Sequence, residues 1–484
     1  MIKETVFGQN LIPDFTGVLA AENSVAETAE WILGGHCADQ KGLPELLRVR
    51  VISTPAPGSR IVSEVWLPKK WNGLFIGTGN GGMGGGICYG ELGGYARDGY
   101  AVANTDLGTS GGRDSAIGNP EVVKDFGWRA THVMTVVGKK LTEAYYGETP
   151  RLSYFLGGST GGQQALSEAQ RFPEDYDGIV AGVPANNRVF LHTYFIWNYH
   201  CLHTENGEPL FTWDEVVTIS DLAAAWFSEK TGITRNYVAY PYAGEDTIPE
   251  FLAYLKARTA FSDRQLTALR MLYEGPRDPV SGKQIYNGMP IGSERYFCGI
   301  MDCQRPHNPN AYPFIWTFGR DYDCETFDYA ADLKAVHEAL SADLNANDPD
   351  LSAFRNHGGK LIAFSGSADA CVPYPDFLGY YLRAAEAEGD MERLQAYFRW
   401  FLLPGKDHGG GGLGTNHFTT DREGRITMLT AIRQYREDGI APERLYAFHS
   451  EENTCRYLEE VPAFGSAEYP VPAYVPLWDA AYFA

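Results

Sequence analysis

One serine stands among four glycines where an apolar run gives way to helix-forming residues. The stretch YFLGGSTGGQQAL, residues 154–166, holds Ser159 at this corner. Gly157–Gly161 fits the Gly-x-Ser-x-Gly pattern of a nucleophile elbow, in which a strained backbone lifts the serine oxygen above the sheet and small neighbours avoid clashes. A glycine-rich connector without chemistry is the alternative, and the pattern alone leaves both interpretations open.

Two later loops supply the partners that a nucleophilic serine needs. A serine hydroxyl reacts poorly unless a histidine removes its proton and a carboxylate orients that histidine. Asp369 follows the apolar run 358–366, and His408 lies in KDHGGGGLG after the run 394–405. The order serine, acid, histidine, with acid and base on loops past strand ends, is that of α/β-hydrolases. Ser159, Asp369 and His408 are therefore the predicted catalytic triad, with solvated loop residues as the alternative for the last two.

Three other residues compete for the acid and base roles. His417 and His449 also lie after Ser159, and Asp407 adjoins His408. Neither rival histidine follows a strand end with a glycine-rich turn, and the carboxylate of an adjacent residue should point away from the imidazole. The four glycines after His408 predict tight backbone packing around it, so we prefer His408 as the base.

An acyl-transfer site also needs donors for the charge that develops on the substrate oxygen. The backbone N–H of Thr160, directly after the nucleophile, is the first expected donor. The run GTGNGGMGGG, residues 77–86, follows an early strand and predicts the second donor at Gly82, with Gly81 as the next choice. This run fits a phosphate-binding loop poorly, because it lacks the Lys-Ser/Thr ending and the spaced acid of a dinucleotide site.

Composition restricts the class of protein. The 484 residues, 44% hydrophobic and 13% aromatic, are enough for two domains or for one core with a large insertion. No stretch approaches a membrane span, and the first residues lack the apolar run of a signal peptide. A net charge of −21 disfavours nucleic acid and anionic membranes as partners. We therefore expect a cytoplasmic protein whose partner is a small molecule.

The eight cysteines are scattered along the chain, at positions 37, 88, 201, 298, 303, 324, 371 and 455. Cys298 and Cys303 form the one close pair, with no second pair to complete a zinc site. Reduced thiols are expected in a cytoplasmic protein, and a disulfide within 298–324 is the alternative for an exported one. We expect neither a metal nor a cofactor.

Strand and helix signals alternate at both ends of the chain. Strands are predicted over 60–68, 73–79, 99–106, 153–158, 177–185, 358–366 and 394–405, and helices over 121–146, 160–171, 376–388 and 423–437. This βαβ rhythm predicts a mostly parallel sheet flanked by helices, the core of an α/β-hydrolase. Between 187 and 350 the rhythm gives way to a segment rich in Tyr, Trp, Phe and Pro. We predict a core in two parts, 1–186 and 351–484, with a lid domain inserted over 187–350.

Several blocks, in order, resemble the tannase and feruloyl esterase family, which also includes MHETase. They are GNGGMGGG, GYAVANTD, DFGWRATH, YFLGGSTGG and EAQRFPEDYDGIVAGVPA, with 272–294 resembling the family's lid and 438–445 its closing helix region. The resemblance implies an α/β-hydrolase fold in which Ser159, Asp369 and His408 match the nucleophile, acid and base. It also implies a serine carboxylic-ester hydrolase acting on esters of small aromatic acids, such as hydroxycinnamates or gallates.

Three places depart from the family pattern. Relatives usually carry cysteines directly before the serine and directly after the histidine, forming a disulfide, where this chain has Gly158 and Gly409. The family's lid usually holds an acid-rich calcium loop, but 233–252 lacks the repeated aspartates, so no calcium is expected. Relatives often have histidine in place of Thr109. None of the three departures falls on the predicted triad.

Two other functions fit the same scaffold. An acyltransferase would pass the acyl group to an alcohol or thiol instead of water, which competition between acceptors would reveal. A non-catalytic binding protein would keep the fold without the chemistry, which a serine-labelling assay would reveal. The complete set of predicted triad residues favours the hydrolase.

Overall fold

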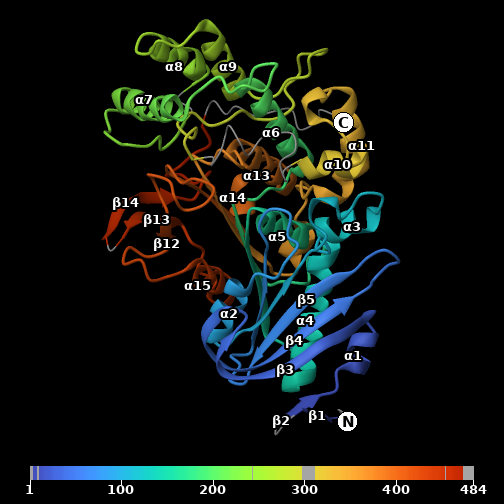
Figure 1. The fold of residues 1–484 in the computed structure, drawn as a ribbon. Coiled ribbons are helices and arrows are strands. Elements are labelled where there is room, and N and C mark those ends of the chain that lie inside the picture. The colour runs from blue at the N-terminus through green and yellow to red at the C-terminus, as the bar shows by residue number, and fades with distance from the viewer. Residues whose placement is uncertain (1–3, 8–9, 242–243, 297–310, 453, 473–484) are drawn as a thin grey trace. The chain divides into compact units, whose positions relative to one another are not determined.

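The computed structural model describes residues 4–7, 10–241, 244–296, 311–452 and 454–472 (Figure 1). The chain divides into two compact units. Unit 1 comprises Met1–Asn186, Phe318–Arg320 and Ala342–Leu361, and unit 2 comprises the remaining segments. Unit 2 begins at Asn187, where the sequence predicts the inserted domain, and it also contains most of the C-terminal part of the chain. A lid role for 187–350 remains a prediction.

Unit 1 is built on strands in the order β9-β8-β6-β7-β5-β4-β3. Figure 1 labels β5, β4 and β3 among them. Their bounds are β3 Ser24–Cys37, β4 Gln40–Ser53, β5 Ile61–Pro68, β6 Leu74–Thr78, β7 Ala101–Thr105, β8 Leu152–Gly158 and β9 Gly178–Gly182. Pairing is parallel among β6, β7, β8 and β9 and antiparallel among β3, β4, β5 and β7. The predicted parallel sheet is therefore confirmed for the half that leads to Ser159, and the other half is antiparallel.

Unit 1 contains helices before and after the strand that leads to Ser159. The helices of this unit are α1 Thr16–Ala20, α2 Tyr89–Arg97, α3 Pro120–Lys124, α4 Ala130–Tyr146, α5 Thr160–Arg171 and α12 Ser352–Asn356, with a short 3₁₀ turn at Gly112–Asp114. The helix predicted over 121–146 is present, but a π-helical turn at Asp125–Arg129 separates α3 from α4. Within this turn a Cβ on Gly127 would lie 2.1 Å from the carbonyl oxygen of Asp343, so glycine permits a direct backbone contact.

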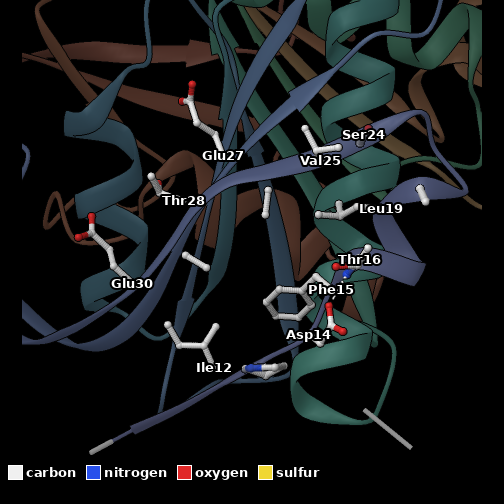
Figure 2. A pocket seen from close by; sticks show the side chains of 14 residues that line it. Ile12, Asp14, Phe15, Thr16, Leu19, Ser24, Val25, Glu27, Thr28 and Glu30 are labelled. Atoms are coloured by element: carbon white, nitrogen blue, oxygen red, sulfur yellow. Dashed lines mark hydrogen bonds between the residues drawn. The ribbon is translucent and has the colours of Figure 1, made fainter. Parts of the chain in front are cut away.

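A short N-terminal segment packs against the outermost strand of unit 1. The hairpin β1 Glu4–Phe7 and β2 Asn10–Pro13 leads into α1, and a pocket of about 620 Å³ lies between this segment and β3 (Figure 2). Ile12, Phe15 and Leu19 supply apolar side chains to it, and all of its lining residues fall between Ile12 and Glu30. The pocket therefore contains none of the residues predicted to carry chemistry.

Unit 2 is rich in helices. They are α6 Arg188–Leu202, α7 Trp213–Thr231, α8 Thr247–Lys256, α9 Asp263–Glu274, α10 Tyr312–Phe318, α11 Ala331–Leu344, α13 Tyr374–Glu388, α14 Met391–Gln395 and α15 Met428–Arg433, with a 3₁₀ turn at Cys324–Thr326 and a π-helical turn at Gln434–Asp438. Helices α10 and α11 each end in a segment assigned to unit 1. The described residues between 187 and 350 form helices and turns without a strand, which fits the weak strand signal of that segment.

Strand β10 Lys360–Gly366 begins in unit 1 and continues into unit 2, which also contains β11 Phe398–Leu403, β12 His417–Thr419, β13 Arg444–Glu451 and β14 Thr454–Pro462. The last three form an antiparallel sheet. Strand β11 is shorter than predicted, because the Asp390 side chain accepts a hydrogen bond from the Arg393 N–H and caps α14. Residues 438–445, which resemble the family's closing helix region, begin where a helix ends: the π-helical turn runs to Asp438, Gly439 has a φ of +71°, and Arg444 begins β13.

Candidate active site

Ser159 occupies a strained corner between β8 and α5. Its φ is 60° and its ψ is −115°, a region that residues with a side chain rarely adopt. The Ser159 N–H donates to the Gly182 carbonyl at 2.9 Å, and its own carbonyl accepts from Gln163 N–H at 3.1 Å. The neighbouring strand and the first helical turn thus hold the serine backbone in this conformation, as the elbow prediction requires.

Glycines around Ser159 allow backbone to meet backbone. A Cβ on Gly157 would lie 2.5 Å from the Gly161 carbonyl oxygen, and one on Gly79 would lie 2.5 Å from the Gly161 Cα. A Cβ on Gly162 would lie 2.7 Å from the Gly182 carbonyl oxygen. Gly158 differs, since the nearest atom to an added Cβ is 3.8 Å away. Gly79, Gly157 and Gly162 are therefore required by packing, whereas position 158 has room for a side chain.

Thr160 and Gly82, the residues of the two predicted oxyanion donors, are in contact beside the elbow. The Thr160 hydroxyl donates to the Gly82 carbonyl at 2.5 Å, and the Gly161 N–H donates to the Asn80 carbonyl at 2.7 Å. Gly82 is exposed and has a φ of +56°, and Gly81 beside it is also exposed. Thr160 is the first residue of α5, where the helix dipole favours negative charge. Unit 1 therefore brings Ser159, Thr160 and Gly82 together, and the oxyanion roles remain a prediction.

Asp369 and His408 form a hydrogen-bonded pair in unit 2. The Asp369 side chain is fully buried, and its Oδ2 lies 2.8 Å from His408 Nδ1. Its Oδ1 accepts the N–H groups of Cys371 at 2.9 Å and Val372 at 2.8 Å, so both carboxylate oxygens have partners. With Nδ1–H donated to the carboxylate, Nε2 of His408 is the nitrogen that accepts a proton. This is the arrangement of a general base and its orienting acid.

The charge of Asp369 also sets the proton affinity of His408. Burial by itself lowers the pKa of an imidazole, because the charged form loses its hydration. In His408 the negative charge of Asp369 and the hydrogen bond to it outweigh burial, so the pKa of His408 is raised above its ordinary value. The imidazolium that forms when a base takes a proton is stabilised in this way.

In the loop after His408, the glycines that are tightly packed lie further along the chain than the sequence predicts. A Cβ on Gly414 would lie 2.5 Å from the backbone of Gly405, and one on Gly412 would lie 3.1 Å from the Gly405 carbonyl oxygen. Gly410 has open space around it, and the nearest atom to a Cβ on Gly409 is 3.9 Å away. Of the four glycines after His408, the prediction of tight packing holds for Gly412 alone, and the closest approach occurs at Gly414, for which no prediction was made.

The rival acid and histidines have other partners. Asp407 accepts the Gly411 N–H at 3.1 Å through Oδ2 and so braces the histidine loop. His449 Nδ1 donates to the Gly414 carbonyl at 2.7 Å, and His417 is exposed on β12. These contacts give Asp407 and His449 a role in loop structure, and they leave Asp369 as the carboxylate bonded to the His408 ring.

Sequence reasoning missed three polar residues beside the elbow. Asn80, Thr109 and Gln164 are all at least 96% buried, and each hydrogen-bonds to the glycine-rich loop or to its neighbours. A signal existed for Gln164, because it lies four residues after Thr160 and hence on the same face of a helix. Thr109 stood out only as a departure from the family pattern, and its hydrogen-bond partner, 26 residues away in the chain, could not be read from the sequence.

One group of ligating side chains occurs among the described residues. His132, Glu168 and Asp175 each place an atom within 4.8 Å of the others. His132 Nδ1 lies 2.6 Å from Asp175 Oδ2, closer than the separation of about 3 Å expected for two ligands of one ion. The Lys139 ammonium donates to the Asp175 carbonyl. The group fits a hydrogen-bonded cluster around a buried acid better than a metal centre.

Cysteines in the described part of the chain form no disulfide. Six are free thiols, at positions 37, 88, 201, 324, 371 and 455. Cys298 and Cys303 lie outside the described residues, so the alternative of a bridge within 298–324 stays open. Among the described helices, none combines the length and apolar character needed to cross a bilayer.

Comparisons with known proteins agree with this geometry. A family model described as tannase and feruloyl esterase matches residues 47–480. A probable feruloyl esterase B of Aspergillus clavatus is 32% identical over 422 residues, covering 82% of this chain and 78% of the relative. Feruloyl esterase B of Aspergillus niger is 29% identical over 429 residues, with the same two shares.

Solved structures support the fold. An esterase from Aspergillus oryzae superposes with a TM-score of 0.79 at 24% identity, covering 93% of this chain and 94% of that one. A tannin acyl hydrolase from Aspergillus niger gives a TM-score of 0.73 at 18% identity, covering 92% and 89%. The predicted α/β-hydrolase fold class is thereby confirmed. Since the family model covers most of its length, the chain belongs to the tannase and feruloyl esterase family.

Proposed function

We propose that this protein is a serine carboxylic-ester hydrolase that cleaves esters of small aromatic acids through an acyl-enzyme. The observation that carries the proposal is the positive φ of Ser159 at the corner of β8 and α5. A strained serine at this place has its hydroxyl presented for attack on a carbonyl. The feruloyl esterases and the tannin acyl hydrolase among the similar proteins point to phenolic acids, such as hydroxycinnamates or gallates.

Each residue of the site has its own role in the proposed ester hydrolysis. Ser159 Oγ attacks the ester carbonyl while His408 Nε2 takes its proton, and Asp369 holds the imidazolium. The N–H groups of Thr160 and Gly82 donate to the oxyanion of the tetrahedral intermediate. His408 then gives the proton to the departing alcohol, and later removes one from the water that releases the acid. The Asp369–His408 hydrogen bond of 2.8 Å supports this assignment.

Aromatic side chains of unit 2 support an aromatic acyl group. The Tyr194 hydroxyl, from α6, donates to the Ala370 carbonyl at 2.8 Å and so ties this helix to the loop of Asp369. The Tyr286 ring is fully buried, with its centroid 5.8 Å from that of Tyr194. Planar apolar walls with a few polar groups suit burial of an aromatic ring. We propose that 187–350 forms the lid that binds the acid.

A screen of esters tests this function directly. Initial rates are measured on methyl ferulate, methyl gallate, chlorogenate, a terephthalate monoester, and ethyl acetate and butyrate. We expect kcat/KM to be highest on one of the aromatic acids and to be lost in Ser159→Ala. Faster turnover of the alkyl esters would reject the aromatic specificity. Product partitioning toward an added alcohol, in preference to water, would instead favour an acyltransferase.

A further inference from the structure

The loop between β6 and α2, residues 79–88, is rich in glycine, yet its proposed role in binding the oxyanion requires a fixed backbone. Six of its ten residues are glycine, and its tip at Gly81 and Gly82 is exposed. Glycine gives the backbone access to many conformations. An oxyanion donor works only when it is held in place before the charge develops. Hydrogen bonds must therefore tie the loop to its surroundings and fix the position of Gly82.

Asn80 anchors the first end of this loop from inside. Its N–H donates to Gln164 Oε1 at 2.8 Å, and its Nδ2 donates to the Thr105 carbonyl at 2.8 Å and the Gly86 carbonyl at 3.1 Å. Gln164 is itself held, since its Nε2 donates to Thr131 Oγ1 at 2.9 Å. Asn80 therefore joins the loop to β7, to its own far end and to the helix that begins after Ser159.

Thr109 holds the turn that contains Gly82. Its side chain is fully buried, and its hydroxyl donates to the Met83 carbonyl at 2.6 Å. The Gly84 N–H donates to the Gly81 carbonyl at 3.0 Å, which closes a turn over Gly82 and Met83. The carbonyl that Thr109 holds is thus the one directly after Gly82.

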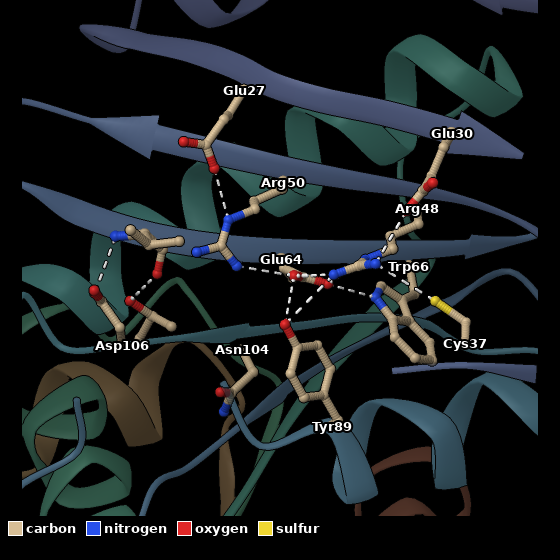
Figure 3. A network of polar contacts seen from close by, with 12 residues as sticks. Glu27, Glu30, Cys37, Arg48, Arg50, Glu64, Trp66, Tyr89, Asn104 and Asp106 are labelled. Atoms are coloured by element: carbon tan, nitrogen blue, oxygen red, sulfur yellow. Dashed lines mark hydrogen bonds and ion pairs between the residues drawn. The ribbon is translucent and has the colours of Figure 1, made fainter. Parts of the chain in front are cut away.

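The second end of the loop is tied to a buried charge network (Figure 3). Asn104 Oδ1 accepts the Cys88 N–H at 2.8 Å, and the Tyr89 hydroxyl reaches from the start of α2 to Glu64 Oε1 at 2.9 Å. Glu64 is fully buried, and Arg48 donates to both of its oxygens, at 2.8 and 2.6 Å. Burial alone raises the pKa of a carboxyl, but these hydrogen bonds lower the pKa of Glu64 overall, which keeps it ionised.

We propose that Asn80, Thr109 and Gln164 are positioning residues, which hold Gly82 and the start of α5 in one fixed relation for oxyanion binding. The proposal rests on the proposed ester hydrolysis. It assigns these side chains no contact with substrate. Their effect is on the transition state, because substrate binding in the ground state does not depend on the oxyanion donors to the same degree.

Thr109→Val tests the proposal with little change of shape, since it replaces the hydroxyl by a methyl group. We expect kcat to fall about 10- to 100-fold with KM changed less than about twofold, because a displaced donor loses part of the 10²–10³-fold effect of its removal. The inhibition constant of an arylboronic acid, whose tetrahedral adduct mimics the intermediate, should rise by the same factor. Thr142→Val is the matched control, because this buried threonine in α4 donates to the Gly138 carbonyl at 2.7 Å, outside the loop.

Asn80→Asp provides a second variant. It keeps the main-chain bonds and removes both Nδ2 donations, so a larger fall in kcat is expected. Hydrogen exchange of the amides in 79–88 should quicken in both variants and stay unchanged in Thr142→Val, whether or not the protein is an esterase. Folded variants with wild-type exchange and wild-type kcat would overturn the proposal. Full ester hydrolysis by the Ser159→Ala variant would reject the proposed function. The hydrogen-exchange rates would still test whether Asn80 and Thr109 hold the loop in place.

Discussion

The region around Ser159 and the region around His408 are organised by different forces. Ser159 is held by glycine contacts and by two uncharged hydrogen bonds, one donated by its N–H to the Gly182 carbonyl and one accepted by its carbonyl from the Gln163 N–H. His408 is held by a carboxylate, and the Lys406 ammonium beside it donates to the Asp407 and Gly409 carbonyls. Geometry therefore governs the nucleophile, and charge governs the base. Substitutions in the first region should act at every pH, and those in the second should change the pH profile.

Loss of the nucleophile is the largest expected effect. Ser159→Ala should lower kcat by about 10⁶-fold, because triad residues act as a unit. The melting temperature should hold or rise, since alanine removes no group on which the observed backbone bonds depend. Single-turnover assays with a fluorophosphonate probe measure the result, and mass spectrometry should find the label on Ser159. Labelling of another serine would contradict the assignment.

Loss of the orienting charge comes next. Asp369→Asn should lower kcat by about 10⁴-fold, the size seen when an asparagine reverses the tautomer of a catalytic histidine. The His408 pKa is raised in the wild type, so activity should fall as the pH drops through that raised value. Without the charge of Asp369 the pKa falls, and the acid limb of the residual rate should move to lower pH. An acid limb that stays in place would show that another group sets it.

A steric substitution tests the nucleophile region by itself. Gly157→Ala places a Cβ 2.5 Å from the Gly161 carbonyl oxygen, so the elbow has to shift. We expect a loss of about 100-fold in kcat across the whole pH range, and about 1–3 kcal/mol of stability by analogy with overpacking. Gly158→Ala is the control, because the nearest atom to its Cβ is 3.8 Å away. Equal losses in the two variants would contradict the packing argument.

The sequence was sufficient to predict elements that depend on neighbouring residues in the chain. The corner at Ser159 was predictable because its glycine pattern and the buried strand before it are contiguous. Strand β3 was not predicted, since most of its residues are exposed and Gly34 and Gly35, both at positive φ, interrupt it. The antiparallel pairing of β5 with β7 was also out of reach, because a fully buried strand carries no signal of its direction.

The sequence also could not predict the roles of side chains that hydrogen-bond to backbone groups far away in the chain. Thr109 and Asn80 bond to carbonyls that tertiary packing brings to them. Asp369 and His408 were predictable as a pair only because each follows a strand end, which places loops at the same edge of a sheet. Their hydrogen bond shows that the two side chains meet, and their catalytic roles stay a prediction.

A buried acid outside both regions should affect stability and not catalysis. Glu168 is buried in α5, and burial, followed by the nearby charge of Asp175, raises its pKa well above the ordinary value, although Lys139 opposes this. The folded protein therefore retains a proton that the unfolded chain releases above about pH 4.3. Stability is complete below that pH and declines as the pH rises toward the folded pKa. His132 completes the group of ionisable side chains around it.

Glu168→Gln removes this dependence, because an amide needs no proton. Its melting temperature should fall less than that of the wild type between pH 5 and pH 8, as measured by differential scanning fluorimetry. Glu174→Gln, at an exposed glutamate nearby, is the control and should follow the wild type. Parallel curves for Glu168→Gln and the wild type would contradict a retained proton.

Removal of calcium should have the smallest effect of all. A calcium site needs six or more oxygen ligands, and 233–252 offers three acids, Glu245, Asp246 and Glu250. One of these, Glu250, has its carboxylate bonded to the Lys230 ammonium, which competes with any cation. We therefore expect the same melting temperature in EGTA, in EGTA with excess calcium and in untreated protein. A drop in EGTA that calcium restores would contradict this, and loss of that drop in Asp246→Asn would locate the ion in the same stretch. An EGTA effect without such loss would place the calcium ligands elsewhere in the chain.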